Sequence, residues 1–283
     1  MKVFGHTVAR MYISVIVLLT LLAAATSYLL REFPYALIFA VVVCAIIEII
    51  IRKYYQKQKF RIPFSGIITG LIIGCVAPIG VPLIPIFIAC AIAVLSKFFI
   101  KIKSSNIFNP AAFGLFGLGI LSIGSSWWAT TDVNVYGIAI SLSIVLVIAA
   151  FESRRLALAL SFIITSALLS ILATPPFTIG NLAIGFISVN YFFAFLMLTE
   201  PKTSPPKNKS QIAYGIYVAV IYFILVVVLP PSIYVAELII FASLLLGNLT
   251  YALSRRIGGM EGLSKLLSAG SMKTETGHSV HHN

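Results

Sequence analysis

The sequence is poor in charged residues. Asp, Glu, Lys and Arg make up 10% of its 283 residues, and only 8 residues are acidic. Apolar residues make up 60%, and the mean hydropathy is +1.05. A soluble globule has too little interior to bury so much apolar surface. The shortage of charge therefore excludes an ordinary soluble domain and predicts an all-α polytopic membrane protein.

Cysteine and histidine are also scarce, which excludes several kinds of redox site. Cys44, Cys75 and Cys90 lie inside apolar runs without CxxC spacing, so we interpret them as small buried hydrophobes. The four histidines lie in the two tails, so no imidazole is available within a span to ligate haem. The chain has no NAD fingerprint, and we expect no metal site.

Apolar runs recur along the chain. Most are about 18 to 22 residues long, which matches the hydrocarbon thickness of a bilayer when the run forms a helix. We predict about ten spans, of which the third and fifth are short. Their approximate ranges are 11–30, 34–51, 64–78, 82–100, 109–123, 135–151, 156–173, 179–198, 211–229 and 234–253.

Basic residues mark one side of this layout, because Lys and Arg in short loops stay on the cytoplasmic side of a membrane. They gather in both tails and in the loops at 52–63, 101–108, 152–155 and 200–210. We therefore predict that both termini are cytoplasmic and that Lys97 extends from its span toward the same side. Orientation explains the net charge of +12, and no nucleic-acid surface is expected.

Ten spans divide into two sets of five, and an odd number per half makes the second half enter from the opposite side. This predicts an inverted repeat in a transmembrane domain at 11–253, with halves at about 11–126 and 127–253. A cytoplasmic N-terminus at 1–10 and a cytoplasmic tail at 254–283 flank it. The alternative is ten unrelated helices.

The fifth predicted span begins at Asn109-Pro110, just after a basic patch. Asn is a good N-cap, and Pro suits the first helical turn. The free N–H groups of that turn would attract an anion or the carbonyl edge of a polar ring, with Gly114 and Gly117 widening the approach. The alternative is a well-capped helix whose glycines allow close packing.

Two further stretches could contribute to a site. Ser65, Gly66, Thr69, Gly70 and Gly74 recur at helical spacing and form a stripe of small residues in the third span. The eighth span ends with Thr199-Glu200-Pro201. Glu200 is either a site residue or a solvated interfacial charge.

These stretches, GIITGLIIG at 66–74, SSNIFNPAAFGL at 104–115 and MLTEPKTSPP at 197–206, together resemble the NqrB/RnfD family of membrane proteins. Its members belong to Rnf electron-transport complexes and to the sodium-pumping NADH:quinone oxidoreductase. The resemblance extends over about 11–253, and NIFNPA at 106–111 is its most specific part. It implies a bundle of inverted repeats, related in architecture to urea channels, in the plasma membrane of a prokaryote.

The resemblance also implies a flavin cofactor and partner subunits in an ion-translocating redox complex. Family members attach FMN to a threonine in a Ser-Gly-Ala-Thr-like signature, and the corresponding loop here is GSSWWATTDVNVYG at 124–137. Only Ala129-Thr130 remains of that signature, and Trp127-Trp128, which stand in place of Ser-Gly, are expected in an aromatic belt at the outer interface. We therefore expect the flavin, FMN or riboflavin, to be bound without a covalent link, and Thr130 is a minor candidate for attachment.

The expected function is electron relay through this flavin, in a cleft between glycine-rich helices. We expect Asn109, Pro110, Ala111 and Ala112 to address the hydrogen-bonding edge of the ring. The opposing residues are expected to be Gly66, Thr69, Gly70 and Thr199. The chief alternative is a urea-channel-like transporter of a small solute, because inverted halves with broken helices also build transporter sites. A structural anchor for a partner is a third possibility.

Overall fold

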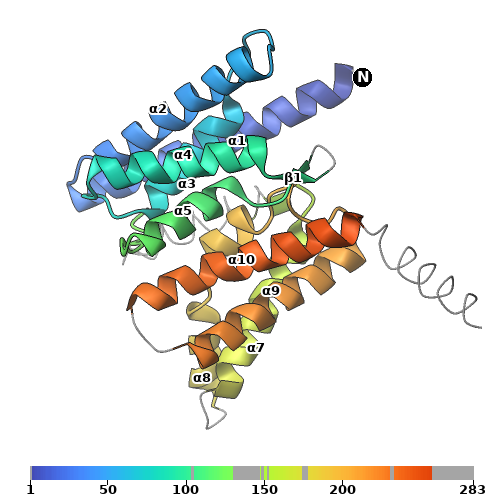
Figure 1. Ribbon diagram of the computed structural model, residues 1–283. Coiled ribbons are helices and arrows are strands. Elements are labelled where there is room, and N and C mark those ends of the chain that lie inside the picture. The colour runs from blue at the N-terminus through green and yellow to red at the C-terminus, as the bar shows by residue number, and fades with distance from the viewer. Residues whose placement is uncertain are drawn as a thin grey trace, which may run out of the picture.

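The structure of the chain is a computed structural model. It describes residues 2–102, 105–129, 147, 150–151, 153–173, 178–229 and 233–256. Within them the fold is a helical bundle, and its strands form one two-stranded antiparallel hairpin. Figure 1 shows α1 to α4 on one side of the bundle, α7 to α10 on the other, and α5 between α4 and α10.

The first half holds five α-helices and the hairpin. They are α1 (Lys2–Leu30), α2 (Tyr35–Ile50), α3 (Phe64–Val76), α4 (Leu83–Phe99), β1 (Lys101–Ile102), β2 (Ser105–Asn106) and α5 (Pro110–Ile120). A π-helical turn, η1 (Ile51–Tyr55), continues α2. As predicted, α3 and α5 are short.

The second half is described from α7 onward. Its elements are α7 (Leu156–Ala173), α8 (Ile179–Ile187), the π-helical η2 (Phe193–Met197), α9 (Asn208–Val228) and α10 (Ile233–Arg256). The predicted span at 135–151 lies mostly outside the described residues, as do Thr130 and the tail beyond 256.

Several of these helices have the length and composition of membrane spans. Within the described residues there are five: Met11–Leu30, Tyr35–Tyr55, Leu156–Ala173, Asn208–Val228 and Leu238–Arg256. Phe64–Val76, Leu83–Phe99 and Pro110–Ile120 are shorter apolar helices. The prediction of an all-α polytopic membrane protein is confirmed.

Glycines bring neighbouring helices into close contact. A Cβ at Gly70 would lie 2.6 Å from the Ala40 carbonyl oxygen of α2, and one at Gly114 would lie 2.6 Å from the Ala89 carbonyl oxygen of α4. Gly114 therefore packs α5 on α4, as the alternative interpretation of the glycines held. In the second half, a Cβ at Gly215 would lie 2.6 Å from the Leu158 carbonyl oxygen, so α9 packs closely on α7.

The packing order is similar in the two halves. Contacts of α2 with α4 and of α4 with α5 have counterparts in α7 with α9 and α9 with α10, and α5 crosses to α10. An inverted repeat would produce this order. Since the sixth predicted span is largely outside the described residues, the repeat and its boundaries stay a prediction.

The structure corrects three details of the sequence-based layout. The eighth span, predicted at 179–198, is broken, because α8 ends at Ile187 and Asn190 caps a new helical start by accepting from the Phe193 N–H at 2.9 Å. Lys97 does not extend to the interface; it is 4% exposed and pairs with Glu48. Trp128 is not part of an interfacial aromatic belt, because it is buried and donates to the Gly74 carbonyl at 2.8 Å.

Candidate functional site

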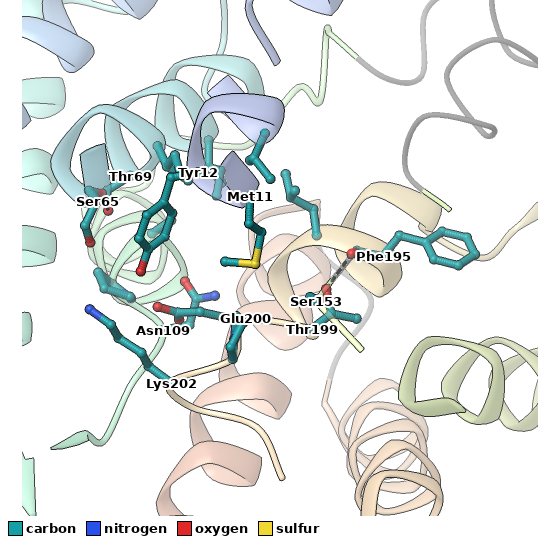
Figure 2. Close-up of a pocket in the computed structure, with 17 residues that line it drawn as sticks. Met11, Tyr12, Ser65, Thr69, Asn109, Ser153, Phe195, Thr199, Glu200 and Lys202 are labelled. Carbon is teal, nitrogen blue, oxygen red and sulfur yellow. Dashed lines mark hydrogen bonds between the residues drawn. The ribbon is translucent and has the colours of Figure 1, made fainter. Parts of the chain in front are cut away.

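A cavity lies where α1, α3 and the start of α5 meet the segment after η2. We call it the inner cavity, since its loops are those that the basic residues predict to be cytoplasmic. It encloses about 90 Å³, and about 710 Å³ when its open mouth is included. Polar side chains on its wall are Tyr12, Ser65, Thr69, Asn109, Ser153, Thr199, Glu200 and Lys202. Figure 2 shows them converging from separate elements.

Asn109 is held by four hydrogen bonds at the base of this cavity. Its side-chain oxygen accepts from the Ala112 N–H at 3.0 Å, and its carbonyl oxygen accepts from the Phe113 N–H at 3.0 Å. Its amide nitrogen donates to the Met197 carbonyl at 2.8 Å, and its backbone N–H donates to Asn248 at 2.9 Å. Asn109 is therefore the N-cap of α5, and its hydrogen bonds to Met197 and Asn248 also link the two halves of the bundle.

Asn248 of α10 extends this link between the halves with further hydrogen bonds. Its amide nitrogen donates to the Tyr214 hydroxyl at 2.7 Å and to the Thr203 carbonyl at 3.3 Å. With the bond from Asn109, every side-chain hydrogen-bonding group of Asn248 has at least one partner. The start of α5 is thus fixed against α9, α10 and the segment after η2.

The Thr199-Glu200-Pro201 segment forms a rim of the inner cavity, on the side that the basic residues predict to be cytoplasmic. The Thr199 hydroxyl donates to the Phe195 carbonyl at 2.5 Å, and the Thr203 hydroxyl donates to the Glu200 carboxylate at 3.1 Å. Burial raises the pKa of Glu200 to about 6, although nearby Lys202 and the Thr203 hydroxyl oppose the rise. The rim therefore carries a carboxyl group that changes charge at mildly acidic pH.

Basic side chains surround the same rim. Burial, and then the neighbouring Lys202, lower the pKa of Lys101. Lys202 itself lines the cavity and lies near Asn109 in Figure 2. The Arg155 guanidinium donates to the Ser204 hydroxyl at 3.1 Å. The mouth thus has a positive field in which Glu200 is the acidic member of the lining.

The structure brings five of the predicted site residues together. Those that line the inner cavity are Thr69, Asn109, Pro110, Ala111 and Thr199. The Ala111 N–H belongs to the first helical turn and has no intrahelical acceptor, whereas Pro110 has no N–H to offer. Their role toward a ligand stays a prediction.

Three predicted residues do not line the cavity. Gly66 and Gly70 face α2, where a Cβ would lie 2.9 Å and 2.6 Å from the Cys44 and Ala40 carbonyl oxygens. The Ala112 N–H is taken by the Asn109 cap. Thr130, the minor candidate for flavin attachment, lies outside the described residues.

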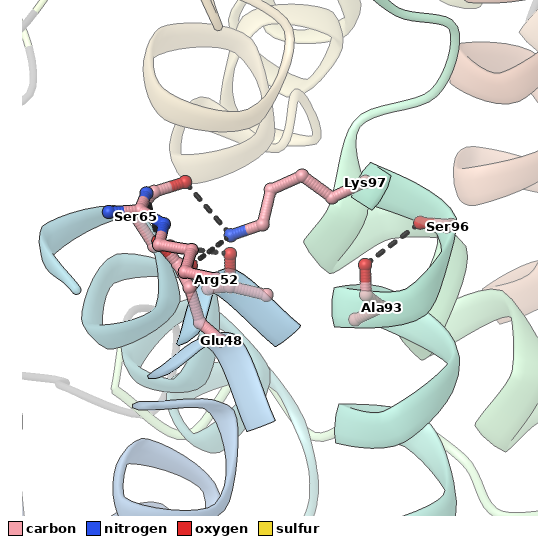
Figure 3. Close-up of polar contacts among 7 residues, drawn as sticks. Glu48, Arg52, Ser65, Ala93, Ser96 and Lys97 are labelled. Atoms are coloured by element: carbon pink, nitrogen blue, oxygen red, sulfur yellow. Dashed lines mark hydrogen bonds and ion pairs between the residues drawn. The ribbon is translucent and has the colours of Figure 1, made fainter. Parts of the chain in front are cut away.

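Sequence reasoning missed a buried ion pair beside this cavity. Glu48 of α2 is 0% exposed, and its carboxylate lies 2.5 Å from the Lys97 ammonium of α4. Arg52 pairs with the other carboxylate oxygen. Lys97 also donates to the Ser65 hydroxyl at 2.9 Å, as Figure 3 shows. The sequence did contain a signal for this pair, because Glu48 and Lys97 each lie inside an apolar run. Charged residues within membrane spans are seldom unpaired, so the two could have been predicted to form an ion pair.

A second cavity of about 310 Å³ lies at the break between α8 and η2. We call it the outer cavity. Its lining is uncharged and consists of Trp127, Phe162, Ser166, Ser170, Ser188, Val189, Asn190, Tyr222 and Ile240. The buried Ser166 hydroxyl has no hydrogen-bond partner within the described part of the chain. Trp127 stacks on Phe241 at 5.7 Å between ring centroids, which stiffens one wall.

Comparison with known proteins gives the family. No curated protein matches the chain. Residues 4–144, which include α2 to α5, nearly all of α1 and the Asn109 cap, match the sequence model of the NQR2, RnfD, RnfE family. The resemblance read from the NIFNPA motif is thereby confirmed, and the chain belongs to the NQR2, RnfD, RnfE family of membrane proteins.

Proposed function

We propose that the chain is the electron-relaying membrane subunit of a redox complex and that it binds FMN or riboflavin without a covalent link in the inner cavity. Membership of an Rnf- and Nqr-type family supports the role of a membrane subunit. The observation that carries the site is that Thr69, Asn109 and Thr199, from three separate segments, line one cavity. Partner subunits would then supply and remove the electrons.

The lining offers the groups that an isoalloxazine ring needs. The ring has apolar faces and a hydrogen-bonding edge. Ile68, Ile72 and Phe195 supply apolar contacts. At the base, Asn109 uses one amide hydrogen on Met197 and keeps a second, and the Ala111 N–H is a further donor.

The size of the cavity is compatible with a flavin ring. With its open mouth it has about 710 Å³, which lies within the range of ordinary ligand clefts. In this proposal the hydrogen-bonding edge of the ring lies toward Asn109 and the ribityl chain lies toward the mouth. Lys202 lies there and would attract the phosphate of FMN.

The visible spectrum of the purified protein tests this proposal. We expect flavin absorbance, complete release of the flavin on acid denaturation, and loss of most bound flavin in the Asn109→Ala variant. Thr250→Ala is a matched control, because Thr250 is exposed and bonds only to carbonyls of its own helix. A folded, colourless protein that cannot be reconstituted with either flavin would contradict the proposal.

The outer cavity favours a second candidate function, passage of a small neutral solute. A break in a helix at membrane depth, beside an uncharged cavity lined with hydroxyls and an amide, is how many transporters build a midplane site. Liposomes containing the protein would then take up urea or a similar amide faster than empty liposomes. A rate equal to that of empty liposomes would remove this candidate.

A further inference from the structure

The charged cluster behind the inner cavity has a direct link to the cavity wall. Lys97 donates to Ser65, and Ser65 lines the cavity whereas Lys97 does not. Ser65 is also half-buried at the first turn of α3. Ser65 is therefore the point at which a buried charge pair reaches the space where a ligand would lie.

The hydrogen bonds around Ser65 determine where its hydroxyl hydrogen can go. An ammonium group has donors and no acceptor, so Ser65 must accept from Lys97 and keep its own hydrogen. Within the described part of the chain that hydrogen has no acceptor. The neighbouring Thr69 hydroxyl donates its hydrogen to the Ser65 backbone carbonyl at 2.8 Å.

The position of Lys97 is itself fixed. Glu48 binds it at 2.5 Å, and Arg52 occupies the other carboxylate oxygen. Gly66 leaves room for this carboxylate, because a Cβ there would lie 2.9 Å from Glu48 Oε2. With both Arg52 and Lys97 beside a single carboxylate, the cluster has a net positive charge just behind the wall.

We propose that Ser65 donates a hydrogen bond to the acceptor edge of the ligand in the inner cavity, and that Lys97, held by Glu48, is the positioning residue that directs this hydrogen. This inference rests on the proposed function and adds a preference for redox state. A reduced flavin ring is negatively charged near neutral pH, so a donor polarised by a buried cation binds the reduced ring more tightly than the oxidised ring.

Titration of the full-length apoprotein with riboflavin tests this assignment, with oxidised riboflavin in one series and dithionite-reduced riboflavin in the other. Ser65→Ala should weaken binding of the oxidised form about fivefold and of the reduced form about 50-fold. The tenfold difference would lower the two-electron midpoint potential of the bound flavin by about 30 mV. Ser65→Thr keeps the hydroxyl and should restore the affinity for both forms.

Two further variants separate positioning from structural support. Lys97→Gln should lower the affinity for the reduced form more than for the oxidised form, whereas Ser96→Ala should change neither. Ser96 is a fair control because it is buried on the same helix and bonds only to the Ala93 carbonyl of its own helix at 2.8 Å. Ser65→Ala leaves the Glu48–Lys97 pair intact, so its folding should be unaffected.

The outcomes distinguish this inference from the proposed function. If the wild-type protein binds riboflavin and Ser65→Ala binds both forms as well as the wild type does, the assignment of Ser65 and Lys97 is wrong and the flavin site stands. If the folded wild-type protein binds neither form, the proposed function fails first and the assignment fails with it.

Discussion

The inner and outer cavities differ in charge. Glu200 and Lys202 line the inner cavity, and the Glu48–Lys97 pair lies directly behind its wall. Only uncharged side chains line the outer cavity, although its volume of about 310 Å³ exceeds the 90 Å³ of the inner cavity. Each has an asparagine N-cap, Asn109 in one and Asn190 in the other.

The difference follows from the cost of placing charge in a bilayer. An isolated charge at membrane depth costs several kcal/mol, so ionisable groups occur where water, a partner or the interface reaches them. The inner cavity opens beside the basic loops, where such contact is available. The outer cavity lies at a helix break, where hydroxyl and amide groups can satisfy the exposed backbone without that cost. The two cavities of one bundle thus differ in whether they contain ionisable groups.

The largest expected effect comes from breaking the buried ion pair. Glu48→Ala leaves Lys97 buried without its carboxylate and should lower the free energy of unfolding by about 3–5 kcal/mol. The double variant Glu48→Gln/Lys97→Gln should recover a large part of that loss, because the buried Lys97 charge is removed and the Arg52 side chain, which is 26% exposed, can be hydrated. Thermal unfolding in detergent measures both. Equal losses in the single and double variants would show that the pair contributes by packing and not by charge.

The two asparagine caps give the next comparison. Serine caps a helix nearly as well as asparagine, so Asn190→Ser should change stability by less than about 0.5 kcal/mol. Asn109→Ser should cost about 1 kcal/mol, because the bond to the Met197 carbonyl is lost, and Asn109→Ala about 2 kcal/mol. Equal effects of the two serine substitutions would mean that Asn109 serves only as a cap.

The pH response should distinguish the cavities as well. Burial raises the pKa of Glu200 to about 6 from an ordinary value near 4.5, so the folded state holds this proton more tightly than the unfolded state. The stabilisation is complete below about 4.5 and is lost as pH rises through about 6. Melting temperatures measured across this range should therefore fall less in Glu200→Gln than in the wild type. Ser166→Ala, in the outer cavity, should keep the full wild-type slope.

The smallest effect is expected at Ser166. Its buried hydroxyl has no partner in the described residues, so Ser166→Ala removes an unsatisfied group and should leave stability unchanged or raise it by up to about 1 kcal/mol. Melting temperature in ligand-free detergent is the measurement. A clear loss of stability would indicate that the hydroxyl binds a ligand or a water molecule in the outer cavity.

Local sequence signals predicted most of the described helices and the cap of α5. Asn109-Pro110 is a strong start signal, and its cap bond is present. Such local signals could not predict which residues far apart in the sequence are in contact. The sequence offers no spacing that connects Glu48 with Lys97, which are 49 positions apart, or Asn109 with Asn248, which are 139 apart.

The glycines show a related limit. Small residues at helical spacing predict that something approaches closely, but they do not tell a ligand from a neighbouring helix. At Gly66 and Gly70 the neighbour is α2, so the part of the stripe that reaches the cavity is its hydroxyl residues, Ser65 and Thr69. The break after α8 could not be predicted either, since single polar residues such as Ser188 and Asn190 also occur within continuous apolar helices.

Asn248 connects the two halves of the bundle through its side-chain hydrogen bonds. It sits in α10, receives the backbone N–H that opens α5, and holds both Tyr214 of α9 and the Thr203 carbonyl. If one half moved against the other, this single amide would have to exchange its hydrogen-bond partners before the base of the cavity could move. The hydrogen bonds of Asn248 would then have to break before each such movement, so the frequency of their breaking would limit its rate.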